Sequence, residues 1–194
     1  MRRKNHISII IFMITLSLYC SYHIYYYFLD TASDDLIRGY YINDTIFEKK
    51  PDVKRVSNEV KEEYLGILKI PKIHLQEGFY DINSKNNNVN KAVTILKEST
   101  FPSSDGGIIF LTAHSGYGYL AFFKDLNKLE INDVVNIDIN KHSYWYIIND
   151  IYEEEKNGKI TVDHNIHENY LVLSTCSNKK DKQLVIIGKL MSDL

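Results

Sequence analysis

Two residues of this 194-residue chain stand where a side chain can do chemistry. Cys176 follows the mostly apolar segment 171–175, and a polar segment comes after it. His114 follows the apolar segment 108–113, and a Ser-Gly-Tyr-Gly turn comes after it. Both patterns predict a strand end, where a side chain is held rigidly and still faces solvent. Because a thiol nucleophile needs a positioned base or cation, and imidazole supplies either, the pair predicts nucleophilic catalysis by a cysteine.

Each of these residues also has a simpler interpretation. Cysteine often acts as a small buried hydrophobe, although the polar segment after Cys176 argues against full burial. His114 alone is compatible with a surface or capping role. His164 and His167 are three positions apart, but no third ligand is spaced to complete a metal site, so we expect neither a metal nor a cofactor.

Short β-type segments dominate the chain after residue 64, and they must position these two side chains. Alternating or β-branched runs bounded by turn residues predict eight strands, over residues 65–70, 74–80, 92–96, 108–113, 134–139, 144–152, 170–174 and 184–190. Apolar residues between positions 119 and 129 recur at three- to four-residue spacing and predict one amphipathic helix. We therefore expect a mainly β fold over residues 64–194, an eight-stranded closed or nearly closed barrel with one or two short helices.

The N-terminal segment is basic and then apolar. Three basic residues at positions 2–4 precede residues 7–29, a run of 23 residues without Asp, Glu, Lys or Arg, which is long enough to cross a bilayer as a helix. The order of charge and apolar run predicts a cytoplasmic tail (1–6), a single transmembrane anchor (7–29) and a partly helical extracytoplasmic connector (30–63). The domain that follows would then lie on the extracellular face of the cell membrane.

The charges are distributed unevenly along the chain. The totals are 23 Lys+Arg against 25 Asp+Glu, which does not suit a protein that binds nucleic acid through a broad basic surface. Every acidic residue lies at position 30 or later, so the predicted exported part holds 20 basic and 25 acidic residues. Cys20 lies in the apolar run, so Cys176 is the only exported thiol and no intramolecular disulfide is expected there.

Four short segments, in this order, resemble the sequence signatures of the sortase family. They are the opening strand that ends in Ile-Pro (64–71), Ala-His-Ser (113–115), the Phe, Leu, Leu and Asp pattern (122–134) and Leu-Ser-Thr-Cys (173–176). The last resembles the family's Thr-Leu-x-Thr-Cys signature, with Val172 in place of the first threonine. The resemblance extends over about residues 64–191.

The resemblance implies a cysteine transpeptidase on a sortase-like barrel. Sortases cleave a C-terminal sorting signal, often Leu-Pro-x-Thr-Gly, after the threonine. Cys176 would attack that carbonyl and form a thioacyl enzyme, and His114 would protonate the leaving amine and later deprotonate the incoming one. The implied partners are secreted proteins that bear such a signal, an amine acceptor such as a lipid-linked peptidoglycan precursor or a pilin lysine, and the membrane through residues 7–29.

The resemblance is incomplete at a third functional residue. Sortases use an arginine early in the last strand to hold the substrate and stabilise the oxyanion, but residues 56–194 contain no arginine. Lys182 and Gln183 stand at the matching place, and we predict that one of them replaces it, by a charge or by an amide donor. Thr175 and Tyr117 are further candidates for the substrate groove.

Two other functions are compatible with these patterns. The missing arginine allows a non-catalytic or very weak barrel that only binds sorting-signal peptides or a wall partner. A simple cysteine peptidase is chemically adjacent, because water then replaces the amine. The papain type is disfavoured, since its cysteine precedes its histidine whereas His114 precedes Cys176 here.

Overall fold

The computed structural model describes residues 2–46, 63–140 and 142–191. Its chain separates into two compact units, one that ends at Leu36 and one that begins at Ile37. Helix α1 (Arg2–Ile46) is continuous across the boundaries expected at residues 6 and 29. The partly helical connector expected over residues 30–63 therefore begins as helix, and residues 47–62 of it lie outside the described residues.

No described stretch of α1 is both long and apolar enough to cross a membrane. The transmembrane anchor expected over residues 7–29 is therefore not supported.

Eight strands form one mixed sheet that is nearly closed into a barrel. In spatial order they are β2 (Leu75–Phe79), β1 (Gly66–Ile70), β5 (Val134–Ile139), β6 (His142–Glu155), β8 (Lys182–Leu190), β7 (Asn169–Cys176), β4 (Gly107–Thr112) and β3 (Thr94–Ile95). An isolated bridge between Phe79 and Val93 joins the two edges of the sheet. The predicted mainly β barrel and all eight predicted strands are confirmed.

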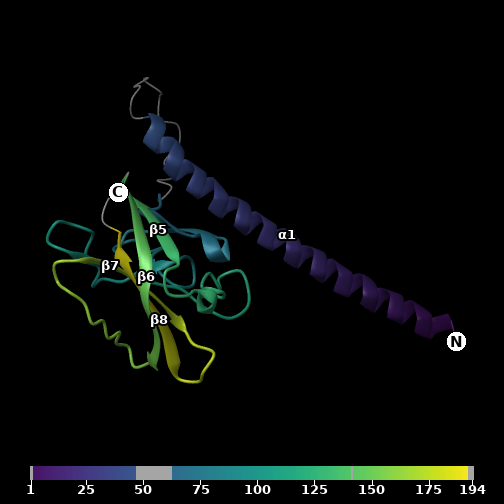
Figure 1. Ribbon diagram of the computed structural model, residues 1–194. Coiled ribbons are helices and arrows are strands. Elements are labelled where there is room, and N and C mark those ends of the chain that lie inside the picture. Colours follow the sequence, from purple (N-terminus) through teal and green to yellow (C-terminus); the bar gives the residue numbers. More distant parts are fainter. Residues whose placement is uncertain (1, 47–62, 141, 192–194) are drawn as a thin grey trace. The chain divides into compact units, whose positions relative to one another are not determined.

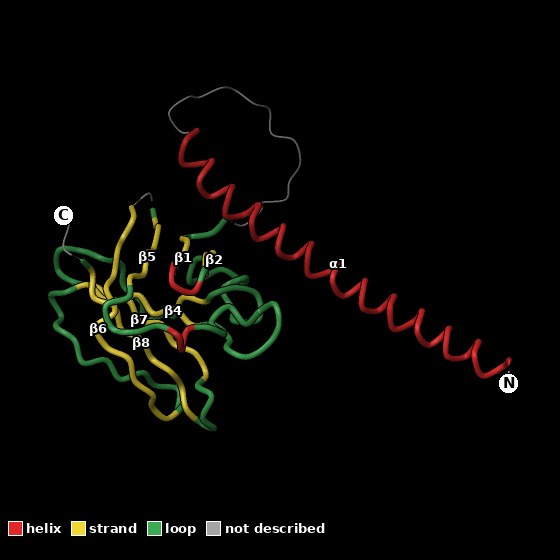
Figure 2. The backbone as a smooth tube through the Cα atoms, turned by 45° about the vertical axis from the view of Figure 1, so that its right-hand side comes forward, coloured by secondary structure: helices red, strands yellow, loops and turns green. Residues whose placement is uncertain are grey.

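Strand β7, which ends at Cys176, lies between β8 and β4, the strand that precedes His114. Strand β8 lies between β6 and β7 and pairs antiparallel with both. The three strands are labelled in Figures 1 and 2. Strand β7 also pairs with β4, and this pair is parallel. Parallel neighbours end at the same edge of a sheet, so the ends of β4 and β7 meet.

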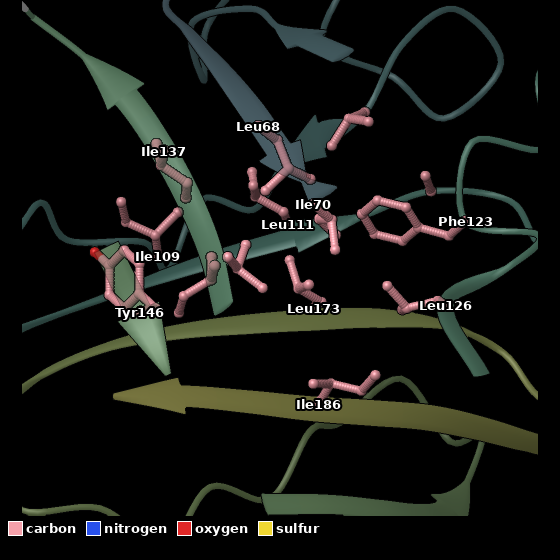
Figure 3. Close-up of a cluster of buried hydrophobic side chains, with 14 of the residues drawn as sticks. Leu68, Ile70, Ile109, Leu111, Phe123, Leu126, Ile137, Tyr146, Leu173 and Ile186 are labelled. Atoms are coloured by element: carbon pink, nitrogen blue, oxygen red, sulfur yellow. The ribbon is translucent and has the colours of Figure 1, made fainter. Parts of the chain in front are cut away.

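The barrel interior is filled by alternate residues of these strands. Ile109 and Leu111 of β4, Leu173 of β7 and Ile186 of β8 are buried and belong to one apolar cluster. Figure 3 shows these side chains directed toward one another, together with Phe123. Because side chains alternate between the two faces of a strand, the residues between them face outward.

A second apolar layer covers part of the outward face. Tyr170, Val172, Val185 and Ile187 of β7 and β8 are buried there, and the partly buried residues of the connection 156–168 that pack on them are Ile160 and Val162. This connection contains no helix. It therefore forms a wall over the outward face of β7 and β8.

The amphipathic helix expected over residues 119–129 is wrong. The segment consists of successive turns and a 3₁₀ helix, η2 (Leu126–Lys128), and the only other 3₁₀ helix of the described residues is η1 (Pro71–Ile73). Buried Phe123, Leu126 and Leu129 recur every three residues. That is the period of a 3₁₀ helix, which places residues i and i+3 on one side.

An ion pair on the outward face joins β1 to β5. Lys69 Nζ lies 2.6 Å from Asp138 Oδ2, and Tyr41 and Ser143 each donate a hydrogen bond to the same carboxylate at 2.7 Å. Burial of Asp138 opposes ionisation, but these three donors outweigh it, so the pKa of Asp138 lies below its usual value.

Candidate active site

The two candidate catalytic residues follow directly from the parallel pair β4 and β7. Thr112 is in register with Ser174, and the amide of Ala113 donates to the carbonyl of Ser174 at 3.4 Å. Two residues further along, these segments reach His114 and Cys176 at the same sheet edge. Cys176 is the last residue of β7, and His114 lies two residues beyond the end of β4. The strand predicted before each residue is therefore present, while the catalytic roles stay a prediction.

Side-chain hydrogen bonds fasten these strand ends to each other. Buried Thr175 donates from Oγ1 to the carbonyl of Ala113 at 2.7 Å. Ser115 donates from Oγ to the carbonyl of Cys176, also at 2.7 Å. The two bonds run in opposite directions between the segments, so neither end can shift without breaking one of them.

Cys176 shares the outward face of the sheet with a set of polar residues. Ser174 is two positions earlier on β7, so it points to the same side. Gln183 of β8 is directly opposite Cys176 in the antiparallel register, and Glu154 of β6 is opposite Gln183. Residues directly opposite in a sheet point to the same face. Glu154, Gln183 and Cys176 therefore lie side by side on the outward face of β6, β8 and β7.

A groove lies on this face, and its lining includes Ser174 and Gln183, which are next to Cys176 on the face, but not Cys176 itself. Its volume is about 510 Å³, and its lining residues are Leu96, Glu98, Phe110, Thr112, Gly158, Lys159, Ile160, Ser174 and Gln183. Strands β4 and β7 supply the floor, and the β6–β7 connection supplies a wall. The volume is within the range that holds a small peptide-sized ligand.

The sulfur of Cys176 also faces a smaller cavity and a lysine. The thiol is partly exposed and, with Thr175, lines a cavity of about 260 Å³ beyond the strand end. Lys156, the first residue after β6, places Nζ 3.1 Å from Cys176 Sγ. Sequence reasoning missed Lys156, because it follows three glutamates and such a charged run is typical of a solvated face.

The imidazole of His114 is oriented by an amide. Its Nε2 lies 3.1 Å from Oδ1 of Asn90. Because that oxygen only accepts, Nε2 carries a hydrogen, and Nδ1 is the nitrogen left for proton exchange in the neutral ring. Asn90 lies in the polar loop before β3, and no sequence signal connected it with His114.

The two residues predicted to replace the family arginine point in different directions. Gln183 is buried on the face of Cys176, and its Nε2 donates to Glu154 Oε1 at 2.8 Å and to the carbonyl of Lys159 at 2.6 Å. Both amide hydrogens are thus directed at partners on the β6 side. Lys182 is the next residue along β8, so it faces the opposite side of the sheet.

The two groove candidates are placed very differently. Thr175 is 5% exposed and acts through its hydrogen bond to Ala113. Tyr117 is fully exposed in the loop after His114 and lines neither cavity described above.

Comparisons with known proteins agree with this geometry. The sortase domain family matches residues 68–191, whereas no curated protein sequence matches the chain. Sortase C1 from Streptococcus suis superposes with a TM-score of 0.59 at 26% identity, covering 69% of this chain and 75% of its own. Sortase C from Streptococcus pneumoniae gives 0.60 at 24% identity, with 75% and 76% covered.

A sortase D5 transpeptidase from Clostridium perfringens has the same fold, with a TM-score of 0.57 at 18% identity and with 69% of this chain and 83% of its own covered. The nearly closed eight-stranded barrel and the match to the sortase domain place this chain in a family whose members are cysteine transpeptidases. The chain belongs to the sortase family.

Proposed function

We propose that this chain cleaves a C-terminal sorting signal through a thioacyl intermediate on Cys176 and transfers the cleaved protein to an amine. The observation that carries the proposal is that Cys176 shares the outward face with Ser174 and Gln183, which line the groove. The sequence matches its family over the segment that contains both Cys176 and His114.

The chemistry divides peptide exchange into two easier steps. The Cys176 thiolate attacks the scissile carbonyl, the carbon–nitrogen bond breaks, and the leaving amine takes a proton from His114. An incoming amine then attacks the thioester, gives its proton to His114 and releases the thiolate. Asn90 holds the imidazole, so the same ring serves as acid and then as base.

The groove suits an extended, partly apolar peptide. Leu96, Phe110 and Ile160 supply apolar surface, while Thr112 and Ser174 supply hydroxyls along the floor. A Leu-Pro-x-Thr-Gly-like segment has the same composition, with apolar residues first and the scissile threonine last. We propose that the apolar residues lie against Ile160 and that the threonine carbonyl reaches Cys176.

Two amine acceptors fit the proposal, a peptidoglycan precursor and a lysine of a pilin. The structure of the pneumococcal sortase C was described in terms of pilin substrate specificity, and we extend that possibility to this chain as part of the proposal. We also propose that the barrel works outside the cytoplasm, since sorting signals are borne by exported proteins. Protease treatment of intact cells should then digest the barrel, and full protection would contradict this location.

A peptide assay on the full-length chain tests the activity. The substrate is a Leu-Pro-x-Thr-Gly peptide with a quencher pair, with and without triglycine or a pilin-derived lysine peptide as acceptor. We expect a thioacyl adduct on Cys176 by mass spectrometry and a transfer product that requires the acceptor. Hydrolysis alone would indicate a peptidase, and intact peptide binding without any thiol-dependent product would indicate a non-catalytic barrel.

Variants of the two cysteines provide the matched controls. Cys176→Ala should abolish the adduct and the product, while Cys20→Ala should leave both unchanged, because Cys20 lies in α1. Product formation by Cys176→Ala at the wild-type rate would show that another group is the nucleophile.

A further inference from the structure

We propose that Lys156 is the catalytic cation of this site and takes the role that the missing arginine has in the family. The inference rests on the proposed function, because it assigns a role within the same reaction. It is carried by the contact between Lys156 Nζ and Cys176 Sγ, 3.1 Å long. Neither Lys182 nor Gln183, the residues at the matching place in the sequence, makes such a contact among the described residues.

The backbone of Lys156 is fixed at the end of β6. Its amide donates to the carbonyl of Asp181 at 2.9 Å, which extends the β6–β8 pairing by one residue beyond the pair of Glu155 with Lys182. Lys156 is two positions after Glu154, so it faces the side that Gln183 and Cys176 share. The backbone position of Lys156 and the side that its side chain faces are therefore set by the sheet and not by a free loop.

The length of the side chain fits the distance that must be crossed. Strands β6 and β7 are separated by β8, so their axes lie about 10 Å apart at the usual strand spacing. A lysine has a four-carbon stem with the charge at its tip, and here it reaches across β8 to the sulfur. An arginine on β8 would act from the middle strand, so the cation has moved one strand away while its charge remains beside Cys176.

Gln183 makes this arrangement possible without supplying the charge itself. Its amide is held by Glu154 and by the carbonyl of Lys159, on the β6 side of the strand. It is therefore drawn away from the sulfur. A bulkier cation at position 183 would compete with Lys156 for the space beside Cys176.

Most of the other charged groups around Cys176 are bound to different partners. Glu153 of β6 forms an ion pair with Lys179, and hydrogen bonds from Lys179 and from Ser177 hold the pKa of Glu153 below its usual value. Lys124 lines the smaller cavity from the opposite loop. Glu154 is bound to Gln183, and His114 to Asn90 on the β4 side.

The position of Lys156 suits both charged states of the reaction. Before attack, an ammonium beside the sulfur favours the thiolate, the form that is nucleophilic. During attack, the sulfur lone pair forms the sulfur–carbon bond and the carbonyl π pair moves to oxygen. The oxyanion then lies two bonds from the sulfur, on the same carbon, and within reach of the same ammonium. It returns its electron pair when the carbon–nitrogen bond breaks and His114 protonates the amine.

The first test measures thiol reactivity and needs no peptide substrate. The full-length chain is alkylated with iodoacetamide over a range of pH, and the rate at each cysteine is read by mass spectrometry. Lys156→Met keeps the length of the side chain and removes the charge. We expect the alkylation rate of Cys176 at neutral pH to fall about tenfold or more, the factor that corresponds to the Coulomb attraction of two charges at this distance in water. We also expect the pH profile of that rate to move to higher pH.

Two internal references make that result specific. Cys20 lies in α1 on the same chain, and its alkylation rate should not change. Lys180→Met removes an equal charge from an exposed position in the β7–β8 loop and should leave the Cys176 profile in place. An unchanged rate and pH profile at Cys176 in Lys156→Met would overturn the proposal. Should that variant fail to fold, Lys156→Gln decides in the same way.

The second test uses turnover of the sorting-signal peptide and separates this inference from the proposed function. Loss of an oxyanion donor typically costs about 10²–10³ in rate, so Lys156→Met should lose about 10²-fold. Lys156→Arg should recover most of it, and so should Lys156→Met combined with Gln183→Arg, which restores the family arrangement. If the alkylation rates shift as expected but the wild-type chain does not turn over the peptide, the proposed function is refuted and the role of Lys156 is retained. If Lys156→Met turns over the peptide at the wild-type rate, the role of Lys156 is refuted and the proposed function is retained.

Discussion

Replacing Thr175 by valine should loosen the junction between the two catalytic strand ends. The change keeps the shape of the side chain and removes only the hydroxyl. That hydroxyl donates to the carbonyl of Ala113 at 2.7 Å in a position that is 5% exposed. The variant therefore leaves a buried carbonyl without this donor, immediately before His114.

The expected cost follows from that burial. Removing one partner of a buried hydrogen bond destabilises a protein by about 1–3 kcal/mol. For a domain of this size, 1 kcal/mol lowers Tm by about 2–4 °C, so Thr175→Val should lower Tm by about 2–12 °C. Thr112→Val is the matched control, because Thr112 makes a similar bond to the carbonyl of Ser174 at 3.0 Å from a partly exposed position. Its cost should be about 0.5–1.5 kcal/mol.

Thermal and urea unfolding of the full-length chain, followed by circular dichroism of the barrel, measures both variants. Turnover of the sorting-signal peptide should fall further in Thr175→Val than in Thr112→Val, since the first bond lies between the two catalytic positions. The reasoning is refuted when Thr175→Val unfolds at the same temperature as Thr112→Val, or at a higher one.

Three further predictions concern other parts of the site and fold. Asn90→Ala should lower turnover about tenfold, because His114 loses the acceptor of its Nε2 hydrogen. That loss is a part of the roughly 10²–10⁴ that general acid–base catalysis contributes. A rate equal to that of wild type in steady-state assays would contradict the orienting role of Asn90. The lowered pKa of Asp138 contributes stability at neutral pH that is lost as pH falls through its folded value, below about 4. Asp138→Asn should therefore lower Tm at pH 7, and the difference from wild type should shrink in acid; a constant difference across the titration would count against it. Gly106→Ala should be strongly destabilising, since φ is +95° and the new Cβ would lie 2.2 Å from a backbone oxygen. Gly116→Ala, at φ +107°, meets no atom within 4 Å and should cost only about 1–2 kcal/mol of backbone strain. Equal losses of stability in chemical denaturation would show that the steric contact at Gly106 does not matter.

Strands were predictable because their signal is local. Alternation of apolar and polar residues reflects which face of a strand is buried, and all eight segments with that pattern are strands. The expected helix over residues 119–129 failed because spacings of three and four are mixed there. Phe123, Leu126 and Leu129, three residues apart, are buried in the core by successive turns. The sequence pattern alone does not distinguish such turns from a helix.

The positions of Cys176 and His114 at the ends of apolar strands were also predictable, because each follows an apolar segment and precedes a polar turn. Their proximity rests on the parallel pairing of β4 with β7, two strands that lie about 60 residues apart along the chain. No pattern in the sequence predicted that pairing, which the structure shows through the register of Thr112 with Ser174.

The cation at the site shows what the amino-acid order alone determines and what it does not. Composition established that no arginine is available after residue 55, and order along the chain pointed to Lys182 and Gln183. Which lysine faces the sulfur depends on strand register and on the order β6-β8-β7, which places Lys156 across a strand from Cys176. Register and strand order arise from contacts distant in sequence. For that reason local pattern determined the strands, the thiol and the imidazole, whereas only the tertiary structure decided which charge stands beside the thiol.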